Sequence, residues 1–211
     1  MTKPLLALDC DQVITDYVSG FTAFVINHGY GLNLDNDFSS YDISTYFNGL
    51  SRNKCRDLIV KYNDTESPPV YGYLKSVIPA LLKKYDIVIV TSHGGGDYAR
   101  KQRLDMLLSL GFTDVFILGL GENKQGILEE LKPDIFIDDN PEQLLAGINA
   151  GVEQVIALEY PYNRDWVDGY NRNRSIGDKK RIKSIQQKNN GKHEEIILEL
   201  KEENIPWVND F

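Results

Sequence analysis

Five short runs of apolar residues recur along the chain, and each is continuous rather than alternating with polar residues. The runs are Leu5–Leu8, Ile87–Val90, Val115–Leu118, Ile135–Ile137 and Val155–Leu158. Several are rich in β-branched residues. Continuous runs of this length are typical of strands that are buried on both faces, as in a parallel sheet. The pattern therefore predicts five parallel strands.

Helical patterns lie between the later runs. Leucines recur with helical spacing in Tyr98–Leu110, which is followed by Gly111, a suitable C-terminal cap, and a second helix is expected over Lys124–Leu131. Asn140 precedes Pro141–Ala150 as an N-cap before a first-turn proline. Strands that alternate with helices predict βαβ units with right-handed crossovers. We therefore expect an α/β fold with a doubly wound, Rossmann-like parallel sheet.

The alternation is interrupted between the first strand and a helix expected over Ser76–Lys84. The intervening residues are rich in Tyr, Phe, Asn, Asp and Ser, with helical patterns at Val18–Asn27 and Arg52–Tyr62 and a hinge at Thr65–Pro69. Structureless loops of such length are rare in compact domains, so we expect a small helical cap inserted after the first strand. The predicted division is a catalytic core of residues 1–17 and 74–170, a cap of residues 18–73, and a C-terminal region of residues 171–211.

The C-terminal region has a different character. Asn171–Lys192 contains eight basic residues and one acid, and His193–Asn204 has the pattern of an acidic amphipathic helix. The basic stretch is the only feature that favours nucleic acid, and such runs are more often solvated arms. The net charge of −8 argues against nucleic-acid binding over the whole surface.

Composition narrows the class of protein further. The 211 residues suit one α/β core with an insertion, and 42% hydrophobic residues can form a sizeable core. Cys10 and Cys55 alone give no disulfide framework, which favours a cytoplasmic location. The first apolar run is too short for a signal peptide, and no run approaches a membrane span. We expect no membrane association, and the sequence indicates nothing about oligomeric state.

Candidate chemical groups follow three of the predicted strands. Asp9 and Asp11 come after the first run, Thr91 and Ser92 after the second, and Asp138 with Asp139 after the fourth, while Lys124 opens a helix; a glycine triplet, Gly94–Gly96, follows Ser92. Ligands bind at the carboxyl ends of strands in doubly wound sheets. Each feature alone also fits a solvated turn, a capped helix or a solvated lysine. Together they predict an oxygen-rich site for Mg²⁺ and a phosphate group.

The order Asp-x-Asp, Thr, Lys and Asp-Asp, each after a strand, resembles the haloacid dehalogenase superfamily of phosphatases. The resemblance covers Pro4–Tyr17 and Leu74–Tyr160. A closer resemblance is to its 5′(3′)-deoxyribonucleotidase-like branch, through Tyr41–Phe47, the Thr-Ser pair and Pro161-Tyr162-Asn163. The chain departs from the pattern at Gln12, where a glycine is usual. Beyond Asn173 it has no counterpart in the branch.

The resemblance implies a role for each motif residue. Asp9 would attack phosphorus and form an aspartyl-phosphate, and Asp11 would act as general acid and then base. Repulsion from neighbouring acids is expected to keep Asp11 protonated at first. Mg²⁺ would be held by Asp9, the backbone carbonyl of Asp11, Asp139 directly and Asp138 through water. Thr91, Ser92 and Lys124 would bind the phosphate group.

The cap is expected to choose the substrate. Tyr17 lies where the deoxyribonucleotidases place an aromatic that stacks on the base, and Tyr46 and His93 are further candidates for substrate contact. For Tyr17 and Tyr46 the competing interpretation is packing within the core of the cap, and for His93 it is capping of the next helix. Cys10 lies between two acids, so its thiol is expected to be unreactive and to serve as a packed strand-end residue.

The sequence thus predicts a Mg²⁺-dependent phosphomonoesterase whose substrate is a nucleoside monophosphate. Two other enzymatic interpretations remain open, a sugar-phosphate phosphatase and a polynucleotide 3′-end phosphatase. A catalytically idle binding protein on the same fold is a third, against which the intact set Asp9, Asp11, Lys124 and Asp139 argues. Preference for base, sugar, and 5′ or 3′ phosphate is not indicated.

Overall fold

The computed structural model describes residues 3–172 and 181–186. Much of the basic stretch, and all of the amphipathic helix expected over His193–Asn204, lie outside these residues. Within them, no helix is both long and apolar enough to cross a membrane.

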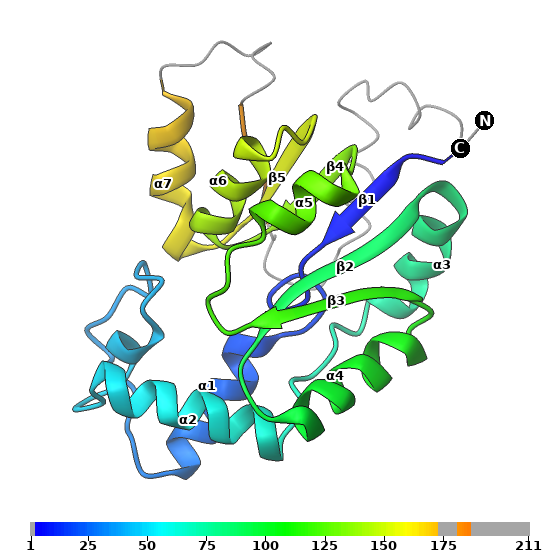
Figure 1. Ribbon diagram of the computed structural model, residues 1–211. Coiled ribbons are helices and arrows are strands. Elements are labelled where there is room, and N and C mark those ends of the chain that lie inside the picture. Colours follow the sequence, from blue (N-terminus) through cyan, green and yellow to red (C-terminus); the bar gives the residue numbers. More distant parts are fainter. Residues whose placement is uncertain (1–2, 173–180, 187–211) are drawn as a thin grey trace.

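A six-stranded, all-parallel sheet forms the centre of the molecule, with the strand order β3-β2-β1-β4-β5-β6 (Figure 1). The strands are β1 Leu5–Leu8, β2 Asp86–His93, β3 Asp114–Gly119, β4 Ile135–Asp138, β5 Gln154–Glu159 and β6 Lys183–Gln186. The chain winds outward from β1 in one direction through β2 and β3, and in the other through β4 to β6. The predicted doubly wound parallel sheet is therefore confirmed.

Helices cover both faces of the sheet. They are α3 Leu74–Lys84, α4 Asp97–Ser109, α5 Gln125–Leu131, α6 Pro141–Asn149 and α7 Pro161–Asn171. Alternate residues of a strand face opposite sides, which divides the core in two. Leu6 and Leu8 of β1 belong to the cluster that contains residues of α3 and α4, whereas Ala7 belongs to the cluster that contains residues of α5, α6 and α7. Burial on both faces explains why these strands are continuous apolar runs.

The last two elements were not predicted from the sequence. Helix α7 is polar, and β6 is an edge strand that reads Lys-Ser-Ile-Gln, so neither carries a clear apolar pattern. The Asn171 side chain fixes β6 instead. Its Nδ2 donates to the Ile182 carbonyl at 2.7 Å, and its Oδ1 accepts from the Ile182 N–H at 3.0 Å. A side-chain bridge of this kind gives no periodic signal in a sequence.

A helical cap follows β1 and lies at the carboxyl ends of the strands (Figure 1). It contains α1 Tyr17–Asn27, a 3₁₀ helix η1 Ile43–Tyr46 and α2 Arg52–Thr65. Asp16 caps α1 by accepting the Ser19 N–H at 3.2 Å. The cap has a small core of its own, in which Phe21 and Val25 of α1 meet Leu58 of α2. The inserted cap is confirmed, whereas its boundaries at residues 18 and 73 stay a prediction.

Candidate active site

The loop after β1 is a tight turn that presents two carboxylates. The Cys10 carbonyl accepts backbone hydrogen bonds from Val13, Ile14 and Thr15, at 3.3, 2.7 and 2.9 Å. Gln12 adopts the left-handed conformation, with φ of 59°, which glycine adopts most easily. Its side-chain oxygen accepts the N–H of Val18 at 2.9 Å. Gln12 therefore replaces the usual glycine without opening the turn, and its side chain links the turn to α1.

Parallel register brings the first and last acidic motifs together. Leu8 of β1 pairs with Ile137 of β4, and the Asp9 N–H donates to the Ile137 carbonyl at 2.9 Å. One carboxylate oxygen from each of Asp9, Asp138 and Asp139 lies within 4.8 Å of the others, and all three residues are buried. The acids that follow β1 and β4 in the sequence therefore lie side by side in the structure.

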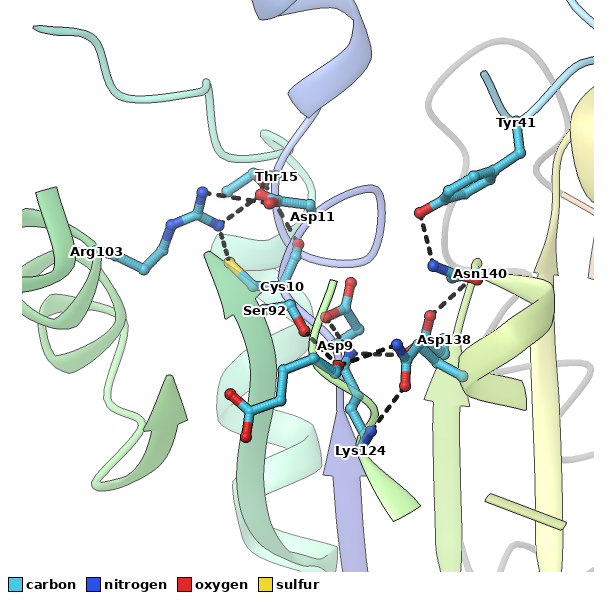
Figure 2. A network of polar contacts seen from close by, with 12 residues as sticks. Asp9, Cys10, Asp11, Thr15, Tyr41, Ser92, Arg103, Lys124, Asp138 and Asn140 are labelled. Atoms are coloured by element: carbon cyan, nitrogen blue, oxygen red, sulfur yellow. Dashed lines mark hydrogen bonds and ion pairs between the residues drawn. The ribbon is translucent and has the colours of Figure 1, made fainter. Parts of the chain in front are cut away.

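Lys124 lies between two of the acids (Figure 2). Its Nζ is 2.5 Å from Asp9 Oδ1 and 2.7 Å from Asp138 Oδ2, and its side chain is 2% exposed. The lysine occupies the N-cap position of α5, where its own N–H donates to Gln143 Oε1 at 2.9 Å. The helix start thus fixes the backbone of the lysine while its side chain reaches back to β1 and β4.

Burial and mutual repulsion dominate the electrostatics of the cluster. Burial raises the pKa of Asp9 to about 7, against the attraction of Lys124 and with added repulsion from Asp138 and Asp11. Burial, Asp138 and Asp9 likewise raise the pKa of Asp139 well above its usual range. Burial alone would lower the pKa of Lys124, but Asp138 and Asp9 outweigh it and raise that pKa. Three buried carboxyl groups therefore share one cationic side chain.

The two acids after β4 differ in their remaining partners. Asp138 accepts Lys124 at Oδ2 and the Asn140 N–H at Oδ1, at 2.8 Å, so both of its oxygens are engaged. Asp139 accepts the Tyr162 hydroxyl at Oδ2, at 2.6 Å, and its backbone carbonyl accepts Asn163 Nδ2 at 2.7 Å. Asp139 therefore keeps a side-chain oxygen with which to bind a cation directly.

The donor set fits Mg²⁺. Hard oxygen ligands from a few carboxylates, completed by water and a phosphate group, are what this ion prefers. Burial, followed by repulsion among the carboxylates, raises the pKa of Asp9 and Asp139, and a divalent cation would offset that repulsion. Asp9 and Asp139 would hold the ion through a free oxygen each, and Asp138 would act through water because Lys124 and the Asn140 N–H occupy its carboxylate.

Asp11 has a partner that the sequence did not indicate. Arg103 of α4 donates to Asp11 Oδ1 at 2.5 Å and approaches Oδ2 at 3.4 Å, and the Thr15 hydroxyl donates to the same Oδ1 at 2.9 Å (Figure 2). The Arg103 side chain is 2% exposed. The expectation that Asp11 is surrounded by acids therefore needs correction, because its carboxylate faces a buried guanidinium. An arginine in a polar helix gives no sequence signal of burial.

The same guanidinium contacts Cys10, whose Sγ lies 2.9 Å from Arg103 Nη1. Cys10 is fully buried. Burial raises the pKa of its thiol to about 12, with Arg103 opposing and Asp11 and Asp9 adding to the rise. The thiol is thus held neutral, which agrees with its expected role as a packed strand-end residue.

The end of β2 and the glycine loop that follows it offer fewer free backbone N–H groups for a phosphate than the sequence predicts. Ser92 lines the cavity, with its hydroxyl donating to the Glu122 carbonyl at 3.2 Å. The Thr91 hydroxyl is buried and has no hydrogen-bond partner among residues 3–172 and 181–186. The Gly96 N–H at the start of α4 donates to Asp64 of the cap at 2.9 Å. A cap carboxylate therefore occupies part of the predicted phosphate cradle.

His93 does not line the main cavity, whereas the other two candidates for substrate contact, Tyr17 and Tyr46, do. It is 3% exposed, its Nδ1 faces Arg103 Nη2 at 3.2 Å, and it lines a small separate cavity. Burial, followed by Arg103, lowers the pKa of His93 to about 4. His93 therefore contacts Arg103 and does not line the main cavity, where a substrate would bind.

A cavity of about 370 Å³ lies between cap and core. Its walls include the aspartate cluster on the core side and Tyr17 and Tyr46 on the cap side. Tyr17 also packs on Phe21 and Tyr62, at ring-centroid distances of 6.0 and 5.4 Å. Tyr46 donates its hydroxyl to the Ser40 carbonyl at 2.8 Å, so its polar end is committed within the cap.

The cap also touches the core directly above the aspartates. Asn140 Nδ2 donates to the Tyr41 hydroxyl at 2.8 Å (Figure 2), and the Tyr41 ring meets Tyr162 edge to face at 5.5 Å. Tyr162 in turn stacks on Tyr160 at 5.3 Å, and the Tyr160 hydroxyl donates to the Gln12 carbonyl at 2.6 Å. These tyrosines brace both acidic loops and one edge of the cap.

Known proteins resemble this chain in sequence and in fold. A 5′(3′)-deoxyribonucleotidase from Bacillus subtilis (strain 168) is 26% identical over 170 residues, which cover 77% of this chain and 89% of that protein. A 5′(3′)-deoxyribonucleotidase of Bacillus phage SPbeta matches to the same extent. No protein-family model matches the sequence.

Two solved structures share the fold. The HAD-hydrolase YfnB from Bacillus subtilis, solved bound to magnesium, superposes with a TM-score of 0.52 and 16% identity over 95% of this chain and 99% of its own. A phosphatase from Clostridium difficile superposes with a TM-score of 0.51 and 13% identity, covering 75% of this chain and 86% of its own. The fold that the resemblance to the haloacid dehalogenase superfamily implies is therefore confirmed, since the chain shares its fold with a HAD-hydrolase.

Proposed function

We propose that the chain is a Mg²⁺-dependent phosphomonoesterase that acts through an aspartyl-phosphate on Asp9, and that its substrates are nucleoside monophosphates. The observation that carries the proposal is the buried group of Asp9, Asp138 and Asp139 with Lys124 between two of them. Buried carboxylates are costly to a fold unless cations compensate them, and ligands of such sheets bind at the carboxyl ends of the strands, so this group is suited to bind a metal and a phosphate.

In the first half of the proposed reaction, an Asp9 carboxylate oxygen attacks phosphorus as the bond to the leaving-group oxygen breaks. Mg²⁺, when bound, would supply positive charge for the phosphoryl oxygens. Lys124 lies 2.5 Å from Asp9 and would reduce the repulsion between this carboxylate and the incoming phosphate. In the second half, water attacks the aspartyl-phosphate, inorganic phosphate leaves and the Asp9 carboxylate is restored.

Asp11 is proposed to exchange the protons. It would protonate the leaving oxygen in the first half and take a proton from the attacking water in the second. Arg103 and Thr15 both contact Oδ1 at 2.9 Å or less, whereas Oδ2 has only a long contact of 3.4 Å with Arg103. The weakly engaged Oδ2 is therefore the oxygen that we assign to proton exchange.

The phosphate group itself would be bound by Ser92 and Lys124, which both line the cavity. Thr91 would contribute its buried hydroxyl, which lacks a partner among the residues that the structure describes. A buried hydroxyl without a partner is costly, so a phosphoryl oxygen or a water bound with it would stabilise the site.

The choice of nucleoside monophosphates rests on the cavity and on the curated relatives. The cavity has space for a leaving group of nucleoside size, and Tyr17 provides an aromatic wall. The two relatives that match over 170 residues are 5′(3′)-deoxyribonucleotidases. Sugar phosphates remain the second candidate, because the cavity would also take them. A polynucleotide 3′-end has less support, because the net charge of −8 argues against nucleic-acid binding over the whole surface.

A substrate panel tests the proposal. The purified chain is incubated with Mg²⁺ and p-nitrophenyl phosphate, deoxynucleoside and ribonucleoside 5′- and 3′-monophosphates, and sugar phosphates, with EDTA as the matched control. We expect Mg²⁺-dependent release of phosphate, fastest with nucleoside monophosphates. Absence of turnover with Mg²⁺, Mn²⁺ and Co²⁺ across the panel would refute the assignment as a phosphomonoesterase. A preference for sugar phosphates would refute only the assignment of nucleoside monophosphates as substrates.

A further inference from the structure

One face of α2 forms part of the cap wall of the cavity. Arg56, Ile59 and Asn63 all line it, and their spacing of three and four residues places them on the same side of the helix. Along this stripe a cation, an apolar side chain and an amide follow one another. The other face of α2 packs in the cap core through Leu58 and Tyr62. The stripe is therefore directed at whatever fills the cavity.

Asn63 is built into the wall rather than solvated. It is 5% exposed, and its Oδ1 has no hydrogen-bond partner within the described part of the chain. It adjoins the glycine loop, since a Cβ on Gly94 would lie 3.5 Å from Asn63 Nδ2. Asn63 lines both the main cavity and the small cavity beside His93, and its unpaired amide oxygen indicates a bound ligand or water, because native proteins rarely leave such atoms unpaired. This amide marks the end of the stripe that is closest to the phosphate loop.

Arg56 marks the opposite end. It is exposed, and it forms no ion pair with any residue in the described ranges. Arg52, one turn earlier, differs because its guanidinium pairs with Asp42 at 2.6 Å. Lys124 is the other cation on the cavity wall, and two aspartates already engage it. Arg56 is thus the cavity cation that remains available to a ligand.

The charges of the cavity are separated between its two sides. The core side carries its acidic residues, which are Asp9, Asp11, Asp138, Asp139 and Glu142, whereas Arg56 stands on the cap side. Seven residues of helix separate Arg56 from Asn63, which is about 10 Å along the helix axis. The arginine therefore lies about two turns from the phosphate loop, at a distance that suits the far end of a leaving group of nucleoside size.

We propose that Arg56 binds a second phosphoryl group on the leaving group, so that nucleoside 3′,5′-bisphosphates are further substrates and are preferred over the monophosphates, with Asn63 accepting a hydrogen bond from the ribose 2′-hydroxyl. This inference rests on the proposed phosphomonoesterase. A guanidinium suits this role because its planar set of N–H donors matches phosphate oxygens in a bidentate arrangement. One phosphoryl group would lie at Asp9 and the other at Arg56.

The test compares two substrates that differ by one phosphoryl group, adenosine 5′-monophosphate and adenosine 3′,5′-bisphosphate. The ratio of their kcat/KM values is measured for wild type, Arg56→Gln and Arg56→Lys. Lys54→Gln is the matched control, because it removes one exposed charge from the same helix outside the cavity wall. We expect Arg56→Gln to lower the ratio of bisphosphate to monophosphate at least about tenfold, which corresponds to about 1.4 kcal/mol. Arg56→Lys should restore part of it, and Lys54→Gln should leave it unchanged.

A ratio that is equal in wild type and Arg56→Gln, or that falls equally in Lys54→Gln, would overturn the role of Arg56 while leaving the phosphomonoesterase intact. If no substrate turns over, the proposed function fails, and binding still decides the role of Arg56. For that purpose the affinities of both nucleotides are measured calorimetrically in Asp9→Asn and Asp9→Asn/Arg56→Gln, with melting curves to verify folding. Loss of affinity confined to the bisphosphate supports the proposal, and equal affinities in both proteins refute it.

Discussion

Replacement of Lys124 by methionine should destabilise the metal-free protein strongly, and more so at high pH. The substitution keeps most of the length of the side chain but removes the cation from between Asp9 and Asp138, at 2.5 and 2.7 Å. Removing one partner of a buried ion pair typically costs about 3–5 kcal/mol, because the other charge stays buried without compensation. The hydrogen bond from the Lys124 N–H to Gln143 is unaffected by the substitution.

The sign of the pH dependence follows from Asp9. Its pKa is raised from 3.8 to about 7 in the folded state, mainly by burial, so the folded protein holds a proton that the unfolded chain has lost. The contribution of Asp9 is therefore present at low pH and is lost as the pH rises from about 4 through about 7. Without Lys124, the attraction that keeps this pKa down is gone. The loss of stability in Lys124→Met should then grow with pH.

Urea denaturation in EDTA at pH 5 and pH 8 measures the effect. Lys101→Met is the control, because Lys101 also pairs with an aspartate at 2.5 Å but its side chain is 68% exposed. Exposed pairs of this kind contribute about 0–1 kcal/mol. If Lys124→Met costs no more than Lys101→Met at pH 8, or costs more at pH 5 than at pH 8, the electrostatic account of the cluster is wrong.

Three further predictions concern the metal and the substrate. Mg²⁺ should raise the melting temperature more at pH 8 than at pH 5, because binding requires the charged forms of Asp9 and Asp139, whose pKa values are raised; an equal rise at both pH values would contradict the assigned ligands. Tyr162→Phe should weaken Mg²⁺ binding about 10- to 100-fold in calorimetry, because it removes the hydrogen bond to Asp139 Oδ2, and an unchanged affinity would show that this bond does not position the ligand. Tyr17→Ala should lower kcat/KM for a deoxynucleoside monophosphate about 5- to 150-fold more than for p-nitrophenyl phosphate, which corresponds to one stacking contact of about 1–3 kcal/mol. Equal losses for both substrates, with a lower melting temperature, would instead assign Tyr17 to the cap core, where it contacts Phe21.

The fold was largely predictable because its central strands are buried on both faces. That burial requires continuous apolar runs, and a parallel sheet requires the helices between them. Helix α7 and strand β6 lacked such a signal, because an edge strand needs no apolar sequence and β6 depends on contacts of the Asn171 side chain. Parallel register then explains why the acids after β1 and β4 could be predicted to meet.

The parts of the site that escaped prediction depend on single long-range contacts. Arg103 reaches Asp11 across 92 residues, and Asp64 of the cap reaches Gly96 across 32. A charged residue in a polar helix is ordinarily solvated, so burial of the Arg103 side chain at 2% exposure has no local signal. The same applies to Arg56, whose place on the cavity wall depends on how α2 packs on the core.

The central claim, that Asp9 is the nucleophile, is tested most directly by kcat of Asp9→Asn with Mg²⁺ and p-nitrophenyl phosphate. The substitution keeps the size of the side chain and removes the attacking oxygen charge, and a melting curve shows whether the fold is kept. The account predicts a loss of several orders of magnitude in kcat with the fold intact. A folded Asp9→Asn that keeps more than about a tenth of the wild-type kcat, a change in barrier of less than about 1.4 kcal/mol, would contradict it.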